Sequence, residues 1–275
     1  MNEGVLVVIG VGGMGQAIAR RTGSGRQVLL ADFNDVTLQA AADLLRGEGH
    51  HVTTQVVDVS DQESVLSLAE AAAGLGRVTH VAHTAGLSAA QAPTDMILRV
   101  DLLGVALVLD MFAQVIAPGG AAVVIASMAG HMATGISADQ ERALAMTPAH
   151  ELLALPFLAS NAVSDPGSAY VLAKRANVLR VQAAAGVWAA RDARVNSISP
   201  GVISTSMAQQ ELSGESGEQM RQMVAMSAAK RLGTPDEIAA VAEFLLSPQA
   251  GFITGTDLLV DGGVIAAART LVPAI

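Results

Sequence analysis

The sequence has no cysteine among its 275 residues, and aromatic and charged residues are scarce. Without cysteine, disulfides, thiol catalysis and cysteine-ligated zinc are excluded, and the composition fits a reducing compartment. Charged residues make up only 15% of the chain, so we expect part of the surface to be buried between subunits. The net charge of −9, without a basic stripe, argues against a nucleic-acid partner.

Apolar runs suited to a membrane are also missing. The longest uncharged stretch, residues 111–138, is interrupted by Pro118 and two glycines and makes a poor membrane span. The first apolar run, Val5–Ile9, lacks the length and basic flank of a signal peptide. The histidines show no metal-ligand spacing. We therefore expect a soluble, cytoplasmic protein without a membrane partner or a metal.

What the sequence does contain is a regular alternation of short β-rich runs with longer helical segments. Such alternation favours βαβ units and a parallel sheet covered on both faces by helices. We predict one α/β domain over residues 1–275, a Rossmann-type, doubly wound sheet of seven parallel strands with helices on both faces. The expected strands are Val5–Ile9, Gln27–Ala31, Val52–Val57, Val78–His83, Ala121–Ala126, Arg194–Ile198 and Asp257–Val260.

A glycine-rich turn follows the first predicted strand. Gly10, Gly12 and Gly15 form G-x-G-x-x-G between a buried strand and a helix, with Gly13 and Met14 between them. Glycine permits the tight turn and the close approach of backbone to a pyrophosphate, and the helix N-terminus attracts the phosphates. In this setting the motif predicts dinucleotide binding, although the motif alone would be weak evidence.

The second predicted strand leads to Asp32, 20 residues after Gly12. This is the position at which a carboxylate accepts hydrogen bonds from the adenosine ribose. Phe33 and two further residues follow without arginine or lysine, so a 2′-phosphate would meet carboxylates and no cation. These residues favour NAD over NADP.

Tyr170 and Lys174 form a Y-x-x-x-K pair, whose spacing places both side chains on one helical face. A neighbouring ammonium favours the phenolate, so we expect Lys174 to lower the pKa of Tyr170 and to make it a usable acid/base.

Together with further motifs, this pair resembles the short-chain dehydrogenase/reductase family along nearly the whole chain. Any one motif could arise by chance, but seven in the right order are specific. The further motifs are VVDVS with Asp58 and Val59, HTAG with Ala85 and Gly86, IASMAG with Ser127, RVNSISPGVIST with Pro200, Val202, Ile203 and Thr205, and a C-terminal stretch at residues 230–263.

The resemblance implies roles for these residues. Ser127 would hydrogen-bond the substrate oxygen. Tyr170 would donate a proton to that oxygen or accept one from it, and Lys174 would bind the nicotinamide ribose. Asp58 and Val59 would contact adenine, and the segment from Pro200 to Thr205 would lie near the nicotinamide and the pyrophosphate. The family usually forms homotetramers through two long helices and the last strand.

The sequence departs from the family pattern at four places. The glycine loop is one residue shorter than usual, and Ile9 stands where threonine is common. Asp101 occupies a position where the family usually has an asparagine that helps to hold a proton-carrying water chain; an ionised carboxylate there could raise the pKa of Tyr170. Thr84 replaces a mostly structural asparagine. Ser127 and Tyr170 are 43 positions apart, far more than usual, as in bacterial 3α-hydroxysteroid dehydrogenase/carbonyl reductases.

Two segments interrupt the alternation of strands and helices. The insertion, residues 137–166, could form an apolar wall of the active site, an arm for oligomer contacts, or both, and it could block a family interface and leave a dimer. Residues 206–230, which are rich in methionine, occupy the position of the family's substrate loop. Their apolar character favours a bulky hydrophobic substrate.

The sequence thus predicts an NAD-dependent oxidoreductase that interconverts an apolar secondary alcohol and its ketone with a Ser–Tyr–Lys set. Two alternatives remain. One is an epimerase or dehydratase that uses the nucleotide transiently. The other is a non-catalytic NAD-binding scaffold.

Overall fold

The computed structural model describes residues 4–159, 162–214 and 217–271. At its centre lies one seven-stranded sheet in the order β3-β2-β1-β4-β5-β6-β7, with every neighbouring pair parallel. This confirms the predicted fold class. The strands are β1 (Val5–Ile9), β2 (Gln27–Asp32), β3 (His51–Val56), β4 (Val78–His83), β5 (Ile116–Ile125), β6 (Arg194–Pro200) and β7 (Asp257–Val260).

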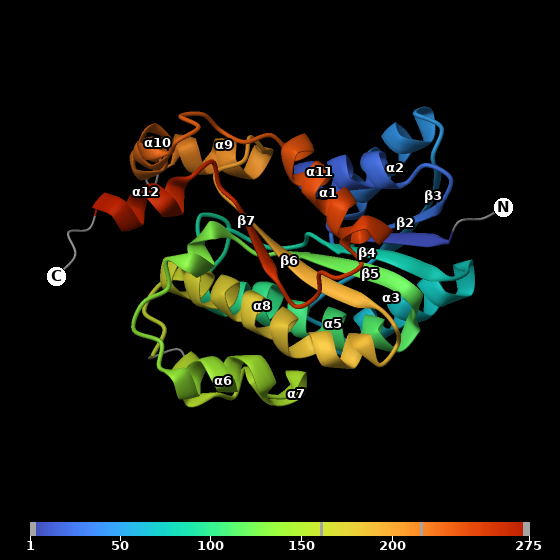
Figure 1. Ribbon diagram of the computed structural model, residues 1–275, viewed down its shortest axis with the longest axis horizontal. Coiled ribbons are helices and arrows are strands. Elements are labelled where there is room, and N and C mark those ends of the chain that lie inside the picture. Colours follow the sequence, from blue (N-terminus) through green and yellow to red (C-terminus); the bar gives the residue numbers. More distant parts are fainter. Residues whose placement is uncertain (1–3, 160–161, 215–216, 272–275) are drawn as a thin grey trace.

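Helices cover both faces of the sheet (Figure 1). On one face lie α1 (Gly13–Thr22), α2 (Asp35–Gly47) and α11 (Pro235–Leu246). On the other lie α3 (Gln62–Leu75), α5 (Gly104–Val115) and α8 (Pro166–Ala189). Each face has its own apolar core, because the strands are buried on both sides; Ile18 and Ile238 belong to one core, and Phe112 and Trp188 to the other.

The helical region between β4 and β5 is not continuous. It consists of α4 (Thr94–Ile97), a π-helical turn at Leu98–Leu103, and α5. A π turn takes up extra residues and changes the direction in which later side chains point, and such turns often occur at functional sites. Asp101 lies within this turn and is fully buried.

The insertion forms a further layer on the outer side of α8. It contains α6 (Ala138–Met146), α7 (Ala149–Leu152) and a short 3₁₀ turn at Pro156–Leu158, and Figure 1 shows α6 and α7 beneath α8. The guanidinium of Arg180, from α8, donates to the carbonyls of Leu144 and Thr147 at 2.9 and 3.0 Å. Leu144 and Leu152 are fully buried in the core of that face.

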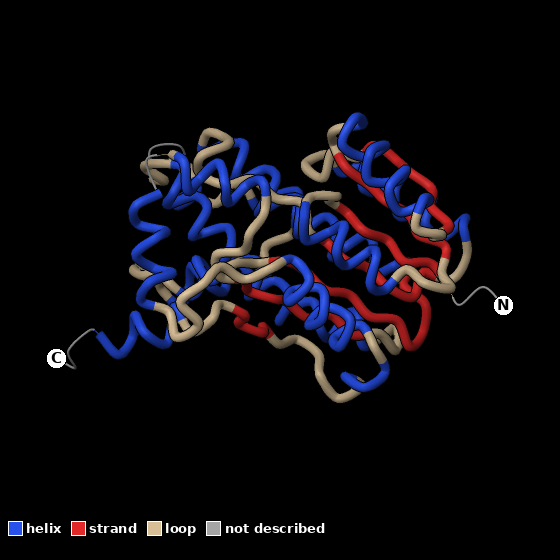
Figure 2. The backbone as a smooth tube through the Cα atoms, turned by 90° about the horizontal axis from the view of Figure 1, so that it is seen from above, coloured by secondary structure: helices blue, strands red, loops and turns tan. Residues whose placement is uncertain are grey.

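The segment after β6 takes a different course. It forms α9 (Ser206–Ser213) and α10 (Gly217–Met226), which contact each other; α10 also contacts α12 (Val264–Leu271). Both views place these three helices at one end of the molecule, near the C-terminus (Figures 1 and 2). Within the described ranges, no helix is both long enough and apolar enough to cross a bilayer.

Candidate active site

A groove of about 450 Å³ opens beyond the carboxyl ends of β1, β2 and β4. The chain reverses its winding direction between β1 and β4, and ligands of open α/β sheets bind at such a switch point. The groove brings together most of the predicted cofactor residues. These are Gly10, Gly12, Gly13, Met14, Gly15, Asp32, Phe33, Asp58, Val59, Ala85, Gly86 and Thr205.

The glycine turn forms the floor of this groove. Gly10 has a φ of +91°, and a side chain there would collide with the backbone of Ala85. A side chain at Gly15 would collide with the carbonyl oxygen of Gly10, whereas one at Gly12 would meet nothing within 4 Å. Helix α1 begins without a side-chain cap, so its first N–H groups remain available to an anion.

Thr84 fixes the start of this turn from the neighbouring strand. Its hydroxyl donates to the carbonyl oxygen of Gly10 at 2.6 Å. Thr84 therefore stabilises the turn through its own hydroxyl, as expected for a position whose role is mostly structural.

Asp32 lies at the end of β2, where its two carboxylate oxygens accept backbone N–H groups. Oδ2 accepts from Val11 at 2.8 Å and Oδ1 from Asn34 at 2.9 Å. These bonds aim the carboxylate at the groove wall. Phe33 beside it is 74% exposed. Among the described residues that line the groove, Arg99 carries the one basic side chain.

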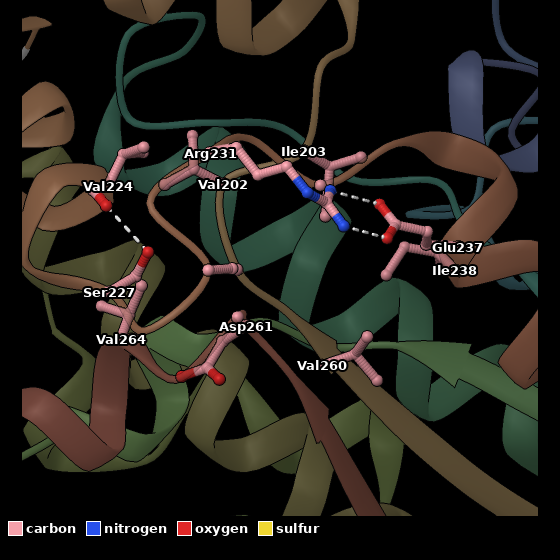
Figure 3. Close-up of a pocket in the computed structure, with 14 residues that line it drawn as sticks. Val202, Ile203, Val224, Ser227, Arg231, Glu237, Ile238, Val260, Asp261 and Val264 are labelled. Carbon is pink, nitrogen blue, oxygen red and sulfur yellow. Dashed lines mark hydrogen bonds and ion pairs between the residues drawn. The ribbon is translucent and has the colours of Figure 1, made fainter.

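The segment after β6 divides between two cavities. Thr205 lines the groove, but Val202 and Ile203 line a smaller cavity of about 80 Å³ (Figure 3). One side of that cavity carries the ion pair of Arg231 with Glu237, whose Nη2 and Oε1 atoms lie 2.7 Å apart. Pro200, the last residue of β6, is buried.

The three expected catalytic residues meet at the N-terminal part of α8. The Lys174 ammonium lies 5.4 Å from the centre of the Tyr170 ring. The Ser127 hydroxyl, just after β5, accepts the N–H of Ala129 at 3.1 Å and lies close enough to the phenol of Tyr170 to lower its pKa. The 3₁₀ turn after Ser127, residues Met128–His131, contacts α8 so closely that a side chain at Gly130 would come within 2.8 Å of the Lys174 backbone.

The pKa of Tyr170 differs from the sequence-based expectation. Burial of the phenol raises its pKa above the usual value, and the lowering effects of Lys174 and Ser127 do not outweigh that burial. Asp101 and Glu211 raise it further. Lys174 therefore lowers the pKa of Tyr170 as expected, but the net shift is upward because burial of the phenol, which the sequence does not report, outweighs it.

Asp101 forms an ion pair with Lys174, with 2.9 Å between Oδ2 and Nζ. Burial raises the pKa of the Asp101 carboxyl against the lowering influence of Lys174. Burial would lower the pKa of Lys174, but Asp101 and Tyr170 outweigh it and raise that pKa above its usual value. The raised pKa of Lys174 keeps its ammonium protonated, and the two groups lie at the distance of an ion pair.

Sequence reasoning missed several residues at the site. Gln91, Met96 and Arg99 line the groove from the segment after β4 and from the helical run around the π turn. Glu211, on α9, faces Tyr170 and has its own pKa raised by partial burial. None of these residues belongs to a motif, so the sequence carried no signal for them beyond their proximity to HTAG and to the segment after β6.

The insertion does not contribute to the groove. None of its described residues lines it, whereas Ser206 and Met207 from the start of α9 do. Leu144 and Leu152, from α6 and α7, belong to the apolar core that α8 and α5 also enter, so part of the insertion is a structural layer. Its role as a wall beside the catalytic residues or as an arm for oligomer contacts stays a prediction.

Comparisons with known proteins identify the family of this chain. Residues 3–138 match the family model described as short chain dehydrogenase, and residues 136–265 match one described as enoyl-(acyl carrier protein) reductase. The chain is 42% identical to the short-chain dehydrogenase/reductase bsc3 of Alternaria brassicicola, with 97% of each covered. It is 30% identical to D-threitol dehydrogenase of Mycolicibacterium smegmatis, covering 94% of this chain and 91% of that protein.

Solved structures give the same picture. The crystal structure of levodione reductase matches with a TM-score of 0.78 and 26% identity, over 97% of this chain and 99% of that one. With the glycine turn, the Ser–Tyr–Lys set and these relatives in agreement, the chain belongs to the short-chain dehydrogenase/reductase family of oxidoreductases.

Proposed function

We propose that this protein is an NAD(H)-dependent oxidoreductase that interconverts an apolar secondary alcohol and its ketone. The observation that carries the proposal is the convergence of Ser127, Tyr170 and Lys174 beside a groove built for a dinucleotide. A hydroxyl, a phenol and an ammonium close together form the donor set that a carbonyl oxygen needs as it gains or loses charge.

The groove fits a nicotinamide dinucleotide. Gly12 leaves open space for a pyrophosphate, the uncapped N-terminus of α1 supplies N–H groups, and Asp32 offers carboxylate oxygens to a ribose. The absence of a basic side chain next to Asp32 and Phe33 supports NAD rather than NADP. When bound, the nicotinamide supplies the hydride acceptor or donor.

The protein's own residues supply orientation and the proton. Ser127 donates a hydrogen bond to the substrate oxygen, and Tyr170 takes the hydroxyl proton during oxidation or returns it during reduction. Lys174 stabilises the phenolate form of Tyr170 in that step. Burial of these groups strengthens each of the interactions by excluding water.

An apolar substrate is supported by the residues around the groove. Leu87, Met96 and Met207 line it, and methionine side chains adapt to apolar ligands of irregular shape. The name of D-threitol dehydrogenase points instead to a polyol for that relative. A substrate panel should therefore contain both classes.

We also propose that the protein is a cytoplasmic homo-oligomer. The insertion covers α8 on the face where the family's two long helices would meet a second subunit. That arrangement supports a dimer over a tetramer. Phe252, which precedes β7, is fully exposed, and Leu258 within this edge strand is 39% exposed, which supports a contact through the last strand.

The proposed reaction is tested by NADH formation with secondary alcohols, hydroxysteroids and polyols, for the wild type and for Tyr170→Phe. We expect turnover of an apolar alcohol with NAD and a loss of at least about a hundredfold in the variant, because the proton acceptor is gone. Equal turnover in the variant would contradict the role of Tyr170. Turnover of polyols only would contradict the apolar substrate, and a preference for NADP would contradict the cofactor assignment.

A further inference from the structure

The ion pair between Lys174 and Asp101 is enclosed almost completely. The two side chains are 6% and 0% exposed, and their charged atoms lie 2.9 Å apart. The other oxygen of Asp101, Oδ1, accepts the backbone N–H of Leu87 at 2.7 Å. The carboxylate is therefore held at one oxygen by the backbone, while the other is aimed at the ammonium.

The π turn at Leu98–Leu103 determines this geometry. Asp101 lies in the turn, which contacts α8 directly. Gly86 lies next to the pair: a side chain there would come within 3.0 Å of Asp101 Oδ2 and 3.1 Å of Lys174 Nζ. Because Gly86 also lines the groove, the ion pair lies directly beside the expected cofactor site.

Tyr170 faces charged and titratable groups from several elements. Lys174 comes from its own helix, Asp101 from the π turn and Glu211 from α9, while the Ser127 hydroxyl, which follows β5, also lowers the pKa of the phenol. His83, at the end of β4, is influenced by Lys174; its pKa is lowered to about 3 by burial, so it is neutral. The phenol is therefore influenced by one cation and two carboxylates.

We propose that Asp101 is a positioning residue whose carboxylate fixes the Lys174 ammonium by a direct ion pair and partly cancels the influence of that ammonium on the Tyr170 phenol. This inference rests on the roles of Tyr170 and Lys174 proposed above. Through this direct contact with Lys174, the carboxylate of Asp101 raises the pH at which Tyr170 loses its proton.

The sign of the effect follows from the charges. The negative charge of Asp101 favours the neutral phenol, so Tyr170 loses its proton at a higher pH than it would beside Lys174 alone. Oxidation of an alcohol needs the phenolate as proton acceptor. The activity of the wild type in that direction therefore rises at a more alkaline pH than it would without the carboxylate.

The chain allows this to be tested without any substrate. Tyr170 is its single tyrosine, so the ultraviolet absorbance of tyrosinate reports the ionisation of this one phenol in the cofactor-free protein. Asp101→Asn keeps the size of the side chain and an oxygen that accepts the N–H of Leu87. We expect the midpoint to fall by about one pH unit, the effect of removing one buried charge at this range.

Asp95→Asn is the matched control, because it removes an exposed carboxylate from α4 in the same run of helix. Its midpoint should equal that of the wild type. Glu211→Gln should lower the midpoint less than Asp101→Asn, since Glu211 is partly exposed. An Asp101→Asn midpoint equal to or above that of the wild type would overturn the proposal.

The wild type provides a second measurement, which does not depend on the variant folding. With Asp101 in place, the phenol should ionise at or above its ordinary pKa of about 10, while circular dichroism shows that the protein is still folded. A midpoint well below that value would refute the inference. Failure of the proposed function appears separately, as absence of NADH formation, and leaves the tyrosinate titration readable.

Discussion

The two segments that interrupt the regular alternation of this chain, residues 137–166 and 206–230, both contain many alanine, leucine or methionine residues but make different contacts. The insertion buries Leu144, Leu152 and Leu158 in the main core, and Arg180 binds two of its carbonyls. Helices α9 and α10 bury little beyond Ala208 and Gly217, and the start of α9 lines the groove. Composition alone therefore does not separate a structural layer from a segment that lines the groove; the contacts of the apolar side chains do.

The largest expected effect tests the structural role of the insertion. Leu152→Ala removes a fully buried side chain and should lower the free energy of unfolding by about 2–5 kcal/mol, measured by urea denaturation. Its affinity for NADH, measured by fluorescence titration, should not change. Leu212→Ala in α9, where the side chain is only partly buried, is the control and should cost less. Equal losses from both variants would remove the distinction between the segments.

A smaller effect concerns His83, which is buried at the end of β4 and belongs to neither segment. Burial lowers the pKa of His83 to about 3, so the folded protein keeps this imidazole neutral while the unfolded chain binds a proton near pH 6.5. The stability from His83 is complete above that pH and is lost as the pH falls toward 3. His83→Asn should therefore reduce the loss of stability on acidification by about 1 kcal/mol per pH unit, followed by urea denaturation between pH 6 and 4. An unchanged slope would show that His83 is already charged in the fold.

The smallest expected effect belongs to the groove. Met207→Ala removes a side chain that lines it at the start of α9, so KM for an apolar alcohol should rise by about three- to tenfold. The midpoint of thermal unfolding should stay within the error of the wild type. A variant of Met146, which is 68% exposed on the insertion, should change neither quantity and is a suitable control. A drop in the stability of Met207→Ala without a change in KM would reverse the roles assigned to the two segments.

The sequence predicted the parts of this protein that depend on local pattern. Apolar runs such as Val5–Ile9 located the strands, and Gly10, Gly12 and Gly15 located the cofactor groove, because a strand–turn–helix unit is complete within twenty residues. The Y-x-x-x-K spacing placed Tyr170 and Lys174 on one face of α8. These features involve contacts between residues that lie close in the chain or follow a fixed order.

What the sequence could not give depends on packing between distant segments. The sequence pattern over residues 95–116 is typical of one continuous helix, and it does not predict the π turn around Asp101. Leu144 and Leu152 have a helical period that suits a cavity wall as well as a layer on α8. The raised pKa of Tyr170 follows from its burial, which appears only once the sheet, α8 and α9 are assembled.

The attachment points of the insertion have a consequence for how such proteins diversify. The extra chain leaves after the 3₁₀ turn that follows Ser127 and returns at Asp165, whose side chain caps α8 by accepting the N–H of Ser168 at 2.9 Å. Ser127 is therefore held by the structure that precedes the insertion, and Tyr170 by the helix that follows it. A change in length between these two points would leave the 3₁₀ turn and the cap of α8, which hold Ser127 and Tyr170, unchanged.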